Sequence, residues 1–206
     1  MEVLDLILIV TIVLSIQGFK KQKRLERLWF SPYRFKHHNE YWRILTHAFV
    51  HADWGHLLIN MFVLYNFGAM VEGLMVAGAW GEASWLPVYG FSILYFGGIF
   101  AAALPALQTK RDRPNYASLG ASGAVAAVIF AFIIRFPSEQ LLLFFIIPIP
   151  AWLAGIGYLA YEYWQTGKRS RIAHDAHLGG AVFGIIFTAL TVTNALPNFL
   201  EVVLGR

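Results

Sequence analysis

Residues 119–125 read Leu-Gly-Ala-Ser-Gly-Ala-Val and open a short apolar segment near the middle of a 206-residue chain. Pro114 and Asn115 precede this segment and favour a turn, so its helix can start only at about residues 120–122. The helix must end before Pro137, which leaves about 14 residues, or ~21 Å at 1.5 Å per residue. Ser122 therefore lies between small residues at the N-terminal end of a short apolar helix, which is an unusual place for a hydroxyl group.

The composition indicates a membrane protein. Hydrophobic residues make up 58% of the chain and charged residues only 14%, whereas a soluble domain carries roughly 25% charged residues. The apolar residues occur in long blocks, so we expect one integral membrane domain over residues 1–206. The chain has no cysteine, which excludes disulfides and thiolate metal sites. Its net charge of +4 suits contact with anionic lipid headgroups better than nucleic acid.

Six apolar blocks predict an all-α, six-helix bundle in the membrane. We expect the spans at residues 3–19, 54–75, 85–107, 120–136, 140–164 and 174–195. Pro148 and Pro150 should bend the fifth span. The fourth span is too short for a ~30 Å hydrocarbon core. We therefore expect non-helical backbone before Ser122 that dips into the protein, which is tolerated only where protein or a water-filled cavity surrounds it.

Polar residues within the spans gather at one depth. His56 and Asn60 lie in the first turns of the second span, Ser122 opens the fourth, and His177 lies one turn into the sixth. Even-numbered spans enter from the same side, so these four side chains should meet in one pocket. Because polar groups inside a membrane are costly, they suggest a functional site.

Ser122 and His177 form a candidate catalytic pair. The sequence Gly180-Ala-Val-Phe-Gly184 has a small-xxx-small spacing that lets the sixth span approach the fourth closely. A histidine in reach of a serine hydroxyl can accept its proton and activate it as a nucleophile. Backbone N–H groups at the helix start, with His56 and Asn60, could stabilise an oxyanion.

We expect a dyad rather than a triad, since no carboxylate obviously completes the site. Asp175 lies two residues before His177, about 200° around the helix. His174 lies near the face of His177 and is either a supporting partner or a polar helix start. His47 and His51 are four residues apart and could bind a metal, but a packing role at the loop entry is favoured because no third ligand accompanies them.

These motifs resemble the rhomboid family of intramembrane serine proteases. The matching sequences are Trp42-Arg43, the stretch from His51 through His56 and Asn60 to Met61, Gly120-Ala-Ser-Gly123, the stretch from Ala176 to Gly180, and the Gly68-x-x-x-Glu72 spacing. Each motif is weak alone, but together, in this order and on these spans, they are a strong signal.

The resemblance implies specific roles. Ser122 would be the nucleophile and His177 the general base and acid. The oxyanion and substrate would be bound by His56, Asn60 and the Gly120 region, and structural support would come from Trp42, Arg43, Glu72, Gly180 and Gly184. The family often has an aromatic residue four positions after the serine, packed on the histidine, but here that residue is Ala126. Another side chain must then hold the imidazole.

The resemblance also implies an intramembrane serine endopeptidase that needs no cofactor or metal. Its partners would be transmembrane protein substrates and the lipid bilayer, and it would bind no nucleic acid. It would be located in a bacterial inner membrane. Two alternatives remain: a catalytically silent relative that binds membrane clients, and a protein that binds haem between His56 and His177. The sequence does not indicate the substrate or the oligomeric state.

The charge distribution conflicts with the family over which side the site faces. Of 16 Lys and Arg residues, 14 fall in the three loops on the side of Ser122. The positive-inside rule places those loops in the cytoplasm, whereas typical bacterial rhomboid proteases open outward. Both orientations stay open.

Overall fold

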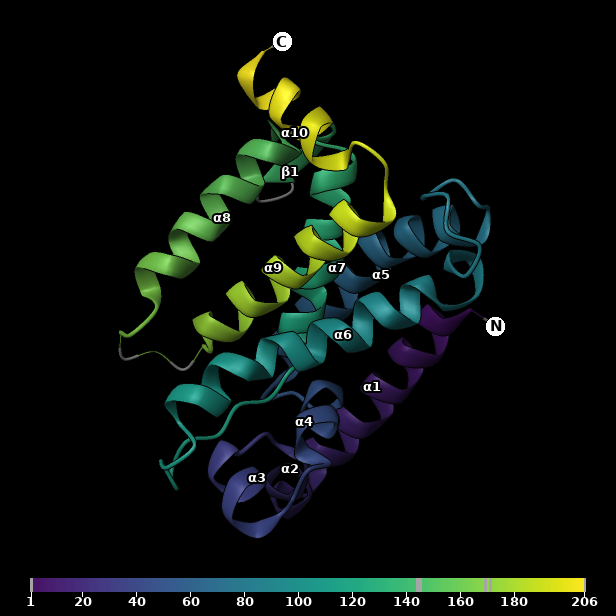
Figure 1. Cartoon of the computed structure of the whole chain (residues 1–206). Coiled ribbons are helices and arrows are strands. Elements are labelled where there is room, and N and C mark those ends of the chain that lie inside the picture. The colour runs from purple at the N-terminus through teal and green to yellow at the C-terminus, as the bar shows by residue number, and fades with distance from the viewer. Residues whose placement is uncertain (1, 144–145, 169, 171, 206) are drawn as a thin grey trace.

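The computed structural model describes residues 2–143, 146–168, 170 and 172–205. Its helices and strands follow in the order shown in Figure 1: α1 (Val3–Lys20), α2 (Gln22–Leu28), α3 (Pro32–His38), α4 (Arg43–Thr46), the 3-10 helix η1 (His47–Phe49), α5 (Trp54–Val76), α6 (Leu86–Thr109), α7 (Ser122–Arg135), β1 (Gln140–Leu143), β2 (Ile147–Pro150), α8 (Ala151–Gln165), α9 (His174–Thr191) and α10 (Ala195–Leu204). The chain is predominantly helical, as the apolar blocks predict.

Three of the described helices are long and apolar enough to cross a membrane. These are α1, α5 and α6, with 18, 23 and 24 residues. Helices α9 and α10 meet the same criterion only as a pair, which bends by 113° at the break between them. Helix α7 is a shorter apolar helix, as expected for the fourth block.

Helix α7 lies at the centre of the bundle. It begins at Ser122, has 14 residues, and buries 11 of them. Helices α5, α6, α8 and α9 all pack against it, and Figure 1 shows α6 and α9 running beside it. A helix that is apolar on every face suits such a position, since no side has to meet the lipid headgroups or water.

Glycines allow α9 to lie directly on α7. A Cβ atom at Gly180 would overlap the carbonyl group of Gly123, and one at Gly184 would overlap the carbonyl group of Ala127. The predicted small-xxx-small contact between the two helices is therefore confirmed. It sets the distance between the start of α7 and the first turns of α9.

The basic loop after α1 folds around Arg43. The Arg43 guanidinium is buried, donates to the carboxylate of Glu40, and donates to the carbonyl oxygens of Glu26 and Trp29 at 2.8 and 2.9 Å. The neighbouring side chain of Trp42 is 54% exposed. Arg43 thus connects three parts of this loop, and the anchoring role of the Trp42-Arg43 pair stays a prediction.

Glu72 joins α5 to α1. Its carboxylate accepts hydrogen bonds from the backbone N–H groups of Val3, at 2.9 Å, and Leu4, at 3.1 Å. These are N–H groups of the first turn of α1, which have no partner within the helix. One turn earlier, Gly68 leaves room for the side chains of Leu4 and Phe91.

The predicted boundaries of the last two spans are wrong. The expected fifth span at 140–164 begins as an antiparallel hairpin in which Gln140 pairs with Pro150, and its helix starts only at Ala151. Proline has no N–H to donate and disfavours helical backbone at the residue before it, so Pro148 and Pro150 precede the helix rather than bend it. The expected sixth span at 174–195 ends at Thr191, and the chain turns at Asn194, which has a φ of 57°.

Candidate active site

Ser122 and His177 are in hydrogen-bond contact. Oγ of Ser122 lies 2.7 Å from Nε2 of His177. Ser122 is the first residue of α7, and His177 lies one turn after the start of α9. Both line a cavity of about 650 Å³, together with His56, Asn60 and Tyr158. The structure thus brings the four predicted polar residues to one pocket, which is formed where α5, α7 and α9 begin.

The non-helical backbone before Ser122 is held by the loop that follows α1. Phe30 and Ser118 exchange two backbone hydrogen bonds of 2.8 and 3.0 Å. Farther along, the N–H of Gly120 donates to the carbonyl of His47 at 2.9 Å. These bonds satisfy backbone groups that lipid could not satisfy, so the non-helical chain before Ser122 needs no solvent for its hydrogen bonds.

A buried histidine completes this support. The N–H of Ala121 donates to Nε2 of His51 at 3.3 Å, and Nδ1 of His51 lies 3.0 Å from Oγ of Ser15 in α1. Since Nε2 accepts, the Nδ1 atom carries the proton and donates to Ser15. His51 and His47 therefore have the predicted packing role at the loop entry.

Both of these histidines are neutral at physiological pH. Burial lowers the pKa of His47 to about 4 and that of His51 to about 3, because a buried imidazolium loses its hydration. For His51, the nearby His56 lowers the pKa further, while Asp53 opposes the shift.

The start of α7, where Ser122 lines the pocket, has unpaired backbone donors. The backbone N–H groups of Ser122 and Gly123 have no acceptor in the part of the chain that the structure describes. Helix starts leave such groups unpaired, and they can bind a negative oxygen atom. Gly120 has a φ of 117°, and a Cβ atom there would overlap the His56 ring, so glycine lets this ring lie against the loop.

Asn60 lies in the pocket, as expected, and one of its amide hydrogens already has an acceptor. Its side-chain amide donates to the carbonyl of His56 at 2.7 Å. An amide has two donor hydrogens, so the second can still reach a ligand.

Glu162 is the residue that sequence reasoning missed. Its Oε1 lies 2.9 Å from Nδ1 of His177, and its Oε2 lies 2.5 Å from Nδ1 of His174. The expectation that no carboxylate accompanies Ser122 and His177 is therefore wrong. Glu162 is the sole acidic residue of the apolar block 151–164, and this could have identified it, because a charged group within such a block has a partner or a function.

Tyr158 supplies the aromatic ring beside His177 that Ala126 cannot supply. Its ring stacks on that of His177, with centroids 6.4 Å apart and an angle of 28° between the planes. Tyr158 lies one helical turn before Glu162, so both project from the same face of α8 toward His177. The ring that steadies His177 comes from α8 instead of α7.

Asp175 points away from the pair, as expected. Its Oδ2 lies 2.6 Å from Nζ of Lys110, which ties the end of α6 to the start of α9. Burial alone would lower the pKa of Lys110, but the hydrogen bond with Asp175 outweighs it and raises this pKa.

One group among the described residues has the spacing of a metal site. Glu162, His174 and His177 offer ligand atoms that lie within 4.8 Å of one another. However, both Nδ1 atoms already contact the carboxylate. A cation would have to displace both hydrogen bonds and the partner of the candidate base.

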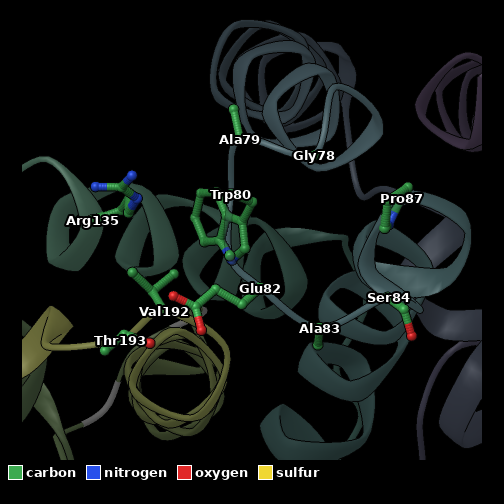
Figure 2. Close-up of a pocket in the computed structure, with 11 residues that line it drawn as sticks. Gly78, Ala79, Trp80, Glu82, Ala83, Ser84, Pro87, Arg135, Val192 and Thr193 are labelled. Atoms are coloured by element: carbon green, nitrogen blue, oxygen red, sulfur yellow. The ribbon is translucent and has the colours of Figure 1, made fainter.

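A second cavity, of about 530 Å³, lies at the opposite end of the bundle. It is lined by Trp80, Glu82, Arg135 and Val192, among others, and Figure 2 shows the Glu82 side chain reaching toward Val192. Trp80 is buried and donates from Nε1 to Oγ1 of Thr191 at 3.2 Å. None of the described lining residues is a histidine, so this cavity offers no imidazole base to a serine.

Comparison with known proteins agrees with the geometry. A model of the Rhomboid domain matches residues 38–194. The chain is 37% identical over 153 residues to RHOMBOID-like protein 12, mitochondrial, of Arabidopsis thaliana, which covers 69% of this chain and 44% of the relative. It is 31% identical over 147 residues to Rhomboid protein 1, mitochondrial, of Saccharomyces cerevisiae, covering 70% of this chain and 40% of the relative.

A human relative, Presenilin-associated rhomboid-like protein, mitochondrial, is 31% identical over 148 residues, which are 69% of this chain and 36% of the relative. The chain thus spans less than half of the length of each of these relatives. With its apolar helices, it is an integral, multi-pass membrane protein. The chain belongs to the rhomboid family.

Proposed function

We propose that this protein is an intramembrane serine endopeptidase that cleaves transmembrane segments of other membrane proteins. The single observation that supports this most strongly is the 2.7 Å contact between Oγ of Ser122 and Nε2 of His177 inside a cavity. A serine hydroxyl is a weak nucleophile until a base takes its proton, and the imidazole is placed to do so.

The proposed reaction proceeds in two steps. Oγ of Ser122 attacks the scissile carbonyl carbon while its proton passes to Nε2 of His177. The backbone N–H groups of Ser122 and Gly123 bind the oxyanion, with His56 and the second amide hydrogen of Asn60 as side-chain donors. His177 then protonates the leaving amine as the C–N bond breaks, and water hydrolyses the acyl-enzyme by the same route.

The substrate is expected to be a helix that unwinds locally. Its backbone is hydrogen-bonded within the membrane, so small or helix-weakening residues near the scissile bond would help to expose the carbonyl to Ser122. The cavity of about 650 Å³ is large enough for a few side chains and for the water that the second step consumes.

The two alternatives have less support. A silent relative that binds clients would not need the Ser122–His177 contact, and this contact is intact. A haem between His56 and His177 would need a free ring nitrogen on His177, whereas Nε2 contacts Ser122 and Nδ1 contacts Glu162. An absorbance scan for a Soret band tests the haem alternative directly.

The membrane in which the enzyme works is a separate question. The relatives named above are mitochondrial, so the comparisons do not support the bacterial inner membrane that the motifs suggested. Fractionation of the native cell distinguishes the two membranes.

The test of the proposed function is cleavage in proteoliposomes. The purified protein is reconstituted with a panel of tagged single-span segments that carry helix-weakening residues, alongside the Ser122→Ala and His177→Ala variants. We expect cleavage within the apolar segment by the unmodified protein alone. Equal cleavage by Ser122→Ala, or labelling of Ser122 by a serine-reactive probe without cleavage of any segment, would overturn the proposal.

A further inference from the structure

Glu162 connects two histidines of α9. Its two carboxylate oxygens are divided between them, with Oε1 at 2.9 Å from Nδ1 of His177 and Oε2 at 2.5 Å from Nδ1 of His174. The Glu162 and His174 side chains are only 5% and 4% exposed, and that of His177 is 14% exposed. A carboxylate placed this deep is costly unless each oxygen accepts a hydrogen bond, and here each one does.

The hydrogen bonds define which nitrogen of each ring carries a proton. A carboxylate only accepts, so Nδ1 of His177 and Nδ1 of His174 must both be protonated. Nε2 of neutral His177 is then free to accept the hydroxyl proton of Ser122, which lies 2.7 Å away. Nε2 of His174 likewise accepts from the hydroxyl of Ser170 at 3.1 Å. These contacts give each ring nitrogen of His174 and His177 a hydrogen-bond partner.

We propose that Glu162 is a positioning residue that converts the Ser122–His177 pair into a Ser-His-Glu triad, with His174 holding the second carboxylate oxygen so that the first one faces His177. This inference rests on the proposed function of the same site. Glu162 touches no reacting atom; it acts through His177.

The proton balance of the triad follows from these contacts. When Oγ bonds to the substrate carbon, its proton moves to Nε2, and His177 becomes an imidazolium whose Nδ1–H stays on Oε1 of Glu162. The carboxylate remains ionised and stabilises the positive ring. When the C–N bond breaks, the Nε2 proton leaves with the amine, and the starting charges are restored.

His174 restricts the movement of the carboxylate. Without its hydrogen bond to Oε2, the Glu162 side chain could rotate, and either oxygen or neither could face His177. The ring of Tyr158, which stacks on that of His177, restrains the plane of the His177 imidazole. Three residues that are separate from the nucleophile therefore determine one ring orientation, as expected of a site that fixes geometry before the substrate binds.

Several other groups near Glu162 and His177 can influence the pH dependence of the site. Tyr158 of α8 interacts with Glu162, His56 of α5 interacts electrostatically with His177, and Ser122 of α7 contacts Nε2. Asp175 and Lys110 form their own ion pair nearby. Asp175 is therefore a matched control, as a second carboxylate close to His177 in the chain that does not contact it.

The test measures how fast a fluorophosphonate probe labels Ser122 as a function of pH. We expect Glu162→Gln to slow labelling about 100-fold or more, because the amide can donate to Nδ1 and favour the wrong tautomer; such a change costs a soluble protease ~10⁴ in kcat. Glu162→Asp should recover part of the rate, and Asp175→Asn should label like the unmodified protein. The half-maximal rate of any residual Glu162→Gln labelling should move to lower pH, which a merely structural role would not produce.

The outcomes separate the two proposals. If Ser122 of the unmodified protein is not labelled, the proposed function fails. If it is labelled, and Glu162→Gln is labelled at the same rate with the same pH dependence, only the triad fails. If Glu162→Gln does not fold, ¹⁵N NMR of the unmodified protein decides: a neutral His177 with its proton on Nδ1 supports the triad, and a proton on Nε2 overturns it.

Discussion

The backbone N–H of Ala121 donates to Nε2 of His51 over 3.3 Å, so a fully buried imidazole holds the residue before Ser122 in place. We predict that His51→Leu leaves this N–H buried without an acceptor, at a cost of about 1–3 kcal/mol. The thermal midpoint in detergent, followed by tryptophan fluorescence, should fall, and Ser122 labelling should slow. His38→Leu, at an exposed position of α3, is the control. An unchanged midpoint and rate for His51→Leu would contradict this role.

Stability should depend on pH through the buried histidines. The pKa of His47 is lowered to about 4 by burial, from 6.5 in the unfolded chain. Between these values the unfolded chain binds more protons, so stability is complete above pH 6.5 and declines as the pH falls toward 4. A shift of this size corresponds to about 3 kcal/mol. Thermal midpoints measured from pH 8 to pH 4 test the prediction.

His47→Gln identifies the source of this pH dependence. Glutamine does not titrate, so the decline between pH 6.5 and 5 should become shallower, whereas His38→Gln at the exposed end of α3 should change nothing. The window lies above the range of Glu40. Burial raises the pKa of that carboxyl, but its bonds to Arg43 and Arg34 outweigh this and lower it, so its contribution is lost only below pH 4.5. Equal slopes for both variants would refute the assignment to His47.

The contact between α7 and α9 should tolerate no added atom. In Gly180→Ala or Gly184→Ala, the methyl group would meet a backbone carbonyl of α7, which cannot move out of the way as a side chain could. We expect a loss of about 1–3 kcal/mol and slower labelling, because Ser122 and His177 must separate.

Gly157→Ala in α8 is the matched control for these glycines. Nothing lies within 4 Å of a Cβ atom at Gly157, so the same substitution should be neutral or stabilise the helix by up to about 1 kcal/mol. The thermal midpoints of the three variants are compared side by side. If the thermal midpoint of Gly180→Ala equals that of Gly157→Ala, the close packing of α9 on α7 does not determine the geometry of the site.

Arg43 should not be replaceable by lysine. Its buried guanidinium donates to a carboxylate and to two carbonyl groups. The single ammonium group of lysine cannot donate to all three acceptors in that geometry. Arg43→Lys should lower stability by about 1–3 kcal/mol and make the loop that follows α1 more sensitive to limited proteolysis. Arg27→Lys, at an exposed position of α2, should leave both unchanged. Matching digestion patterns for the two variants would count against this role of Arg43.

Much of the site was predictable because it depends on helix geometry. Two prolines bounding a short apolar segment indicated where α7 starts, and equal depth on alternate spans predicted that His56, Ser122 and His177 line one cavity. The glycine spacing of Gly180 and Gly184 predicted the close contact with α7. These inferences need only the period of a helix and the cost of polar groups in lipid.

The rest depends on how distant segments are placed. Pro148 and Pro150 were consistent with a bent helix or with a hairpin, and only the pairing of Gln140 with Pro150 distinguishes the two. Glu162 and His177 are 15 residues apart on different helices, so no spacing rule joins them. The carboxylate nearest to His177 in the sequence is that of Asp175, on the same helix, whereas the carboxylate that contacts His177 comes from α8.

In the proposed mechanism, Ser122 is a nucleophile that His177 activates. The most direct measurement is peptide mapping by mass spectrometry after treatment of the detergent-solubilised protein with a fluorophosphonate probe. We expect one adduct, on Ser122, that is lost in Ser122→Ala and strongly reduced in His177→Ala. No adduct on the folded, unmodified protein, or an adduct on Ser122 that forms equally fast in His177→Ala, would contradict it.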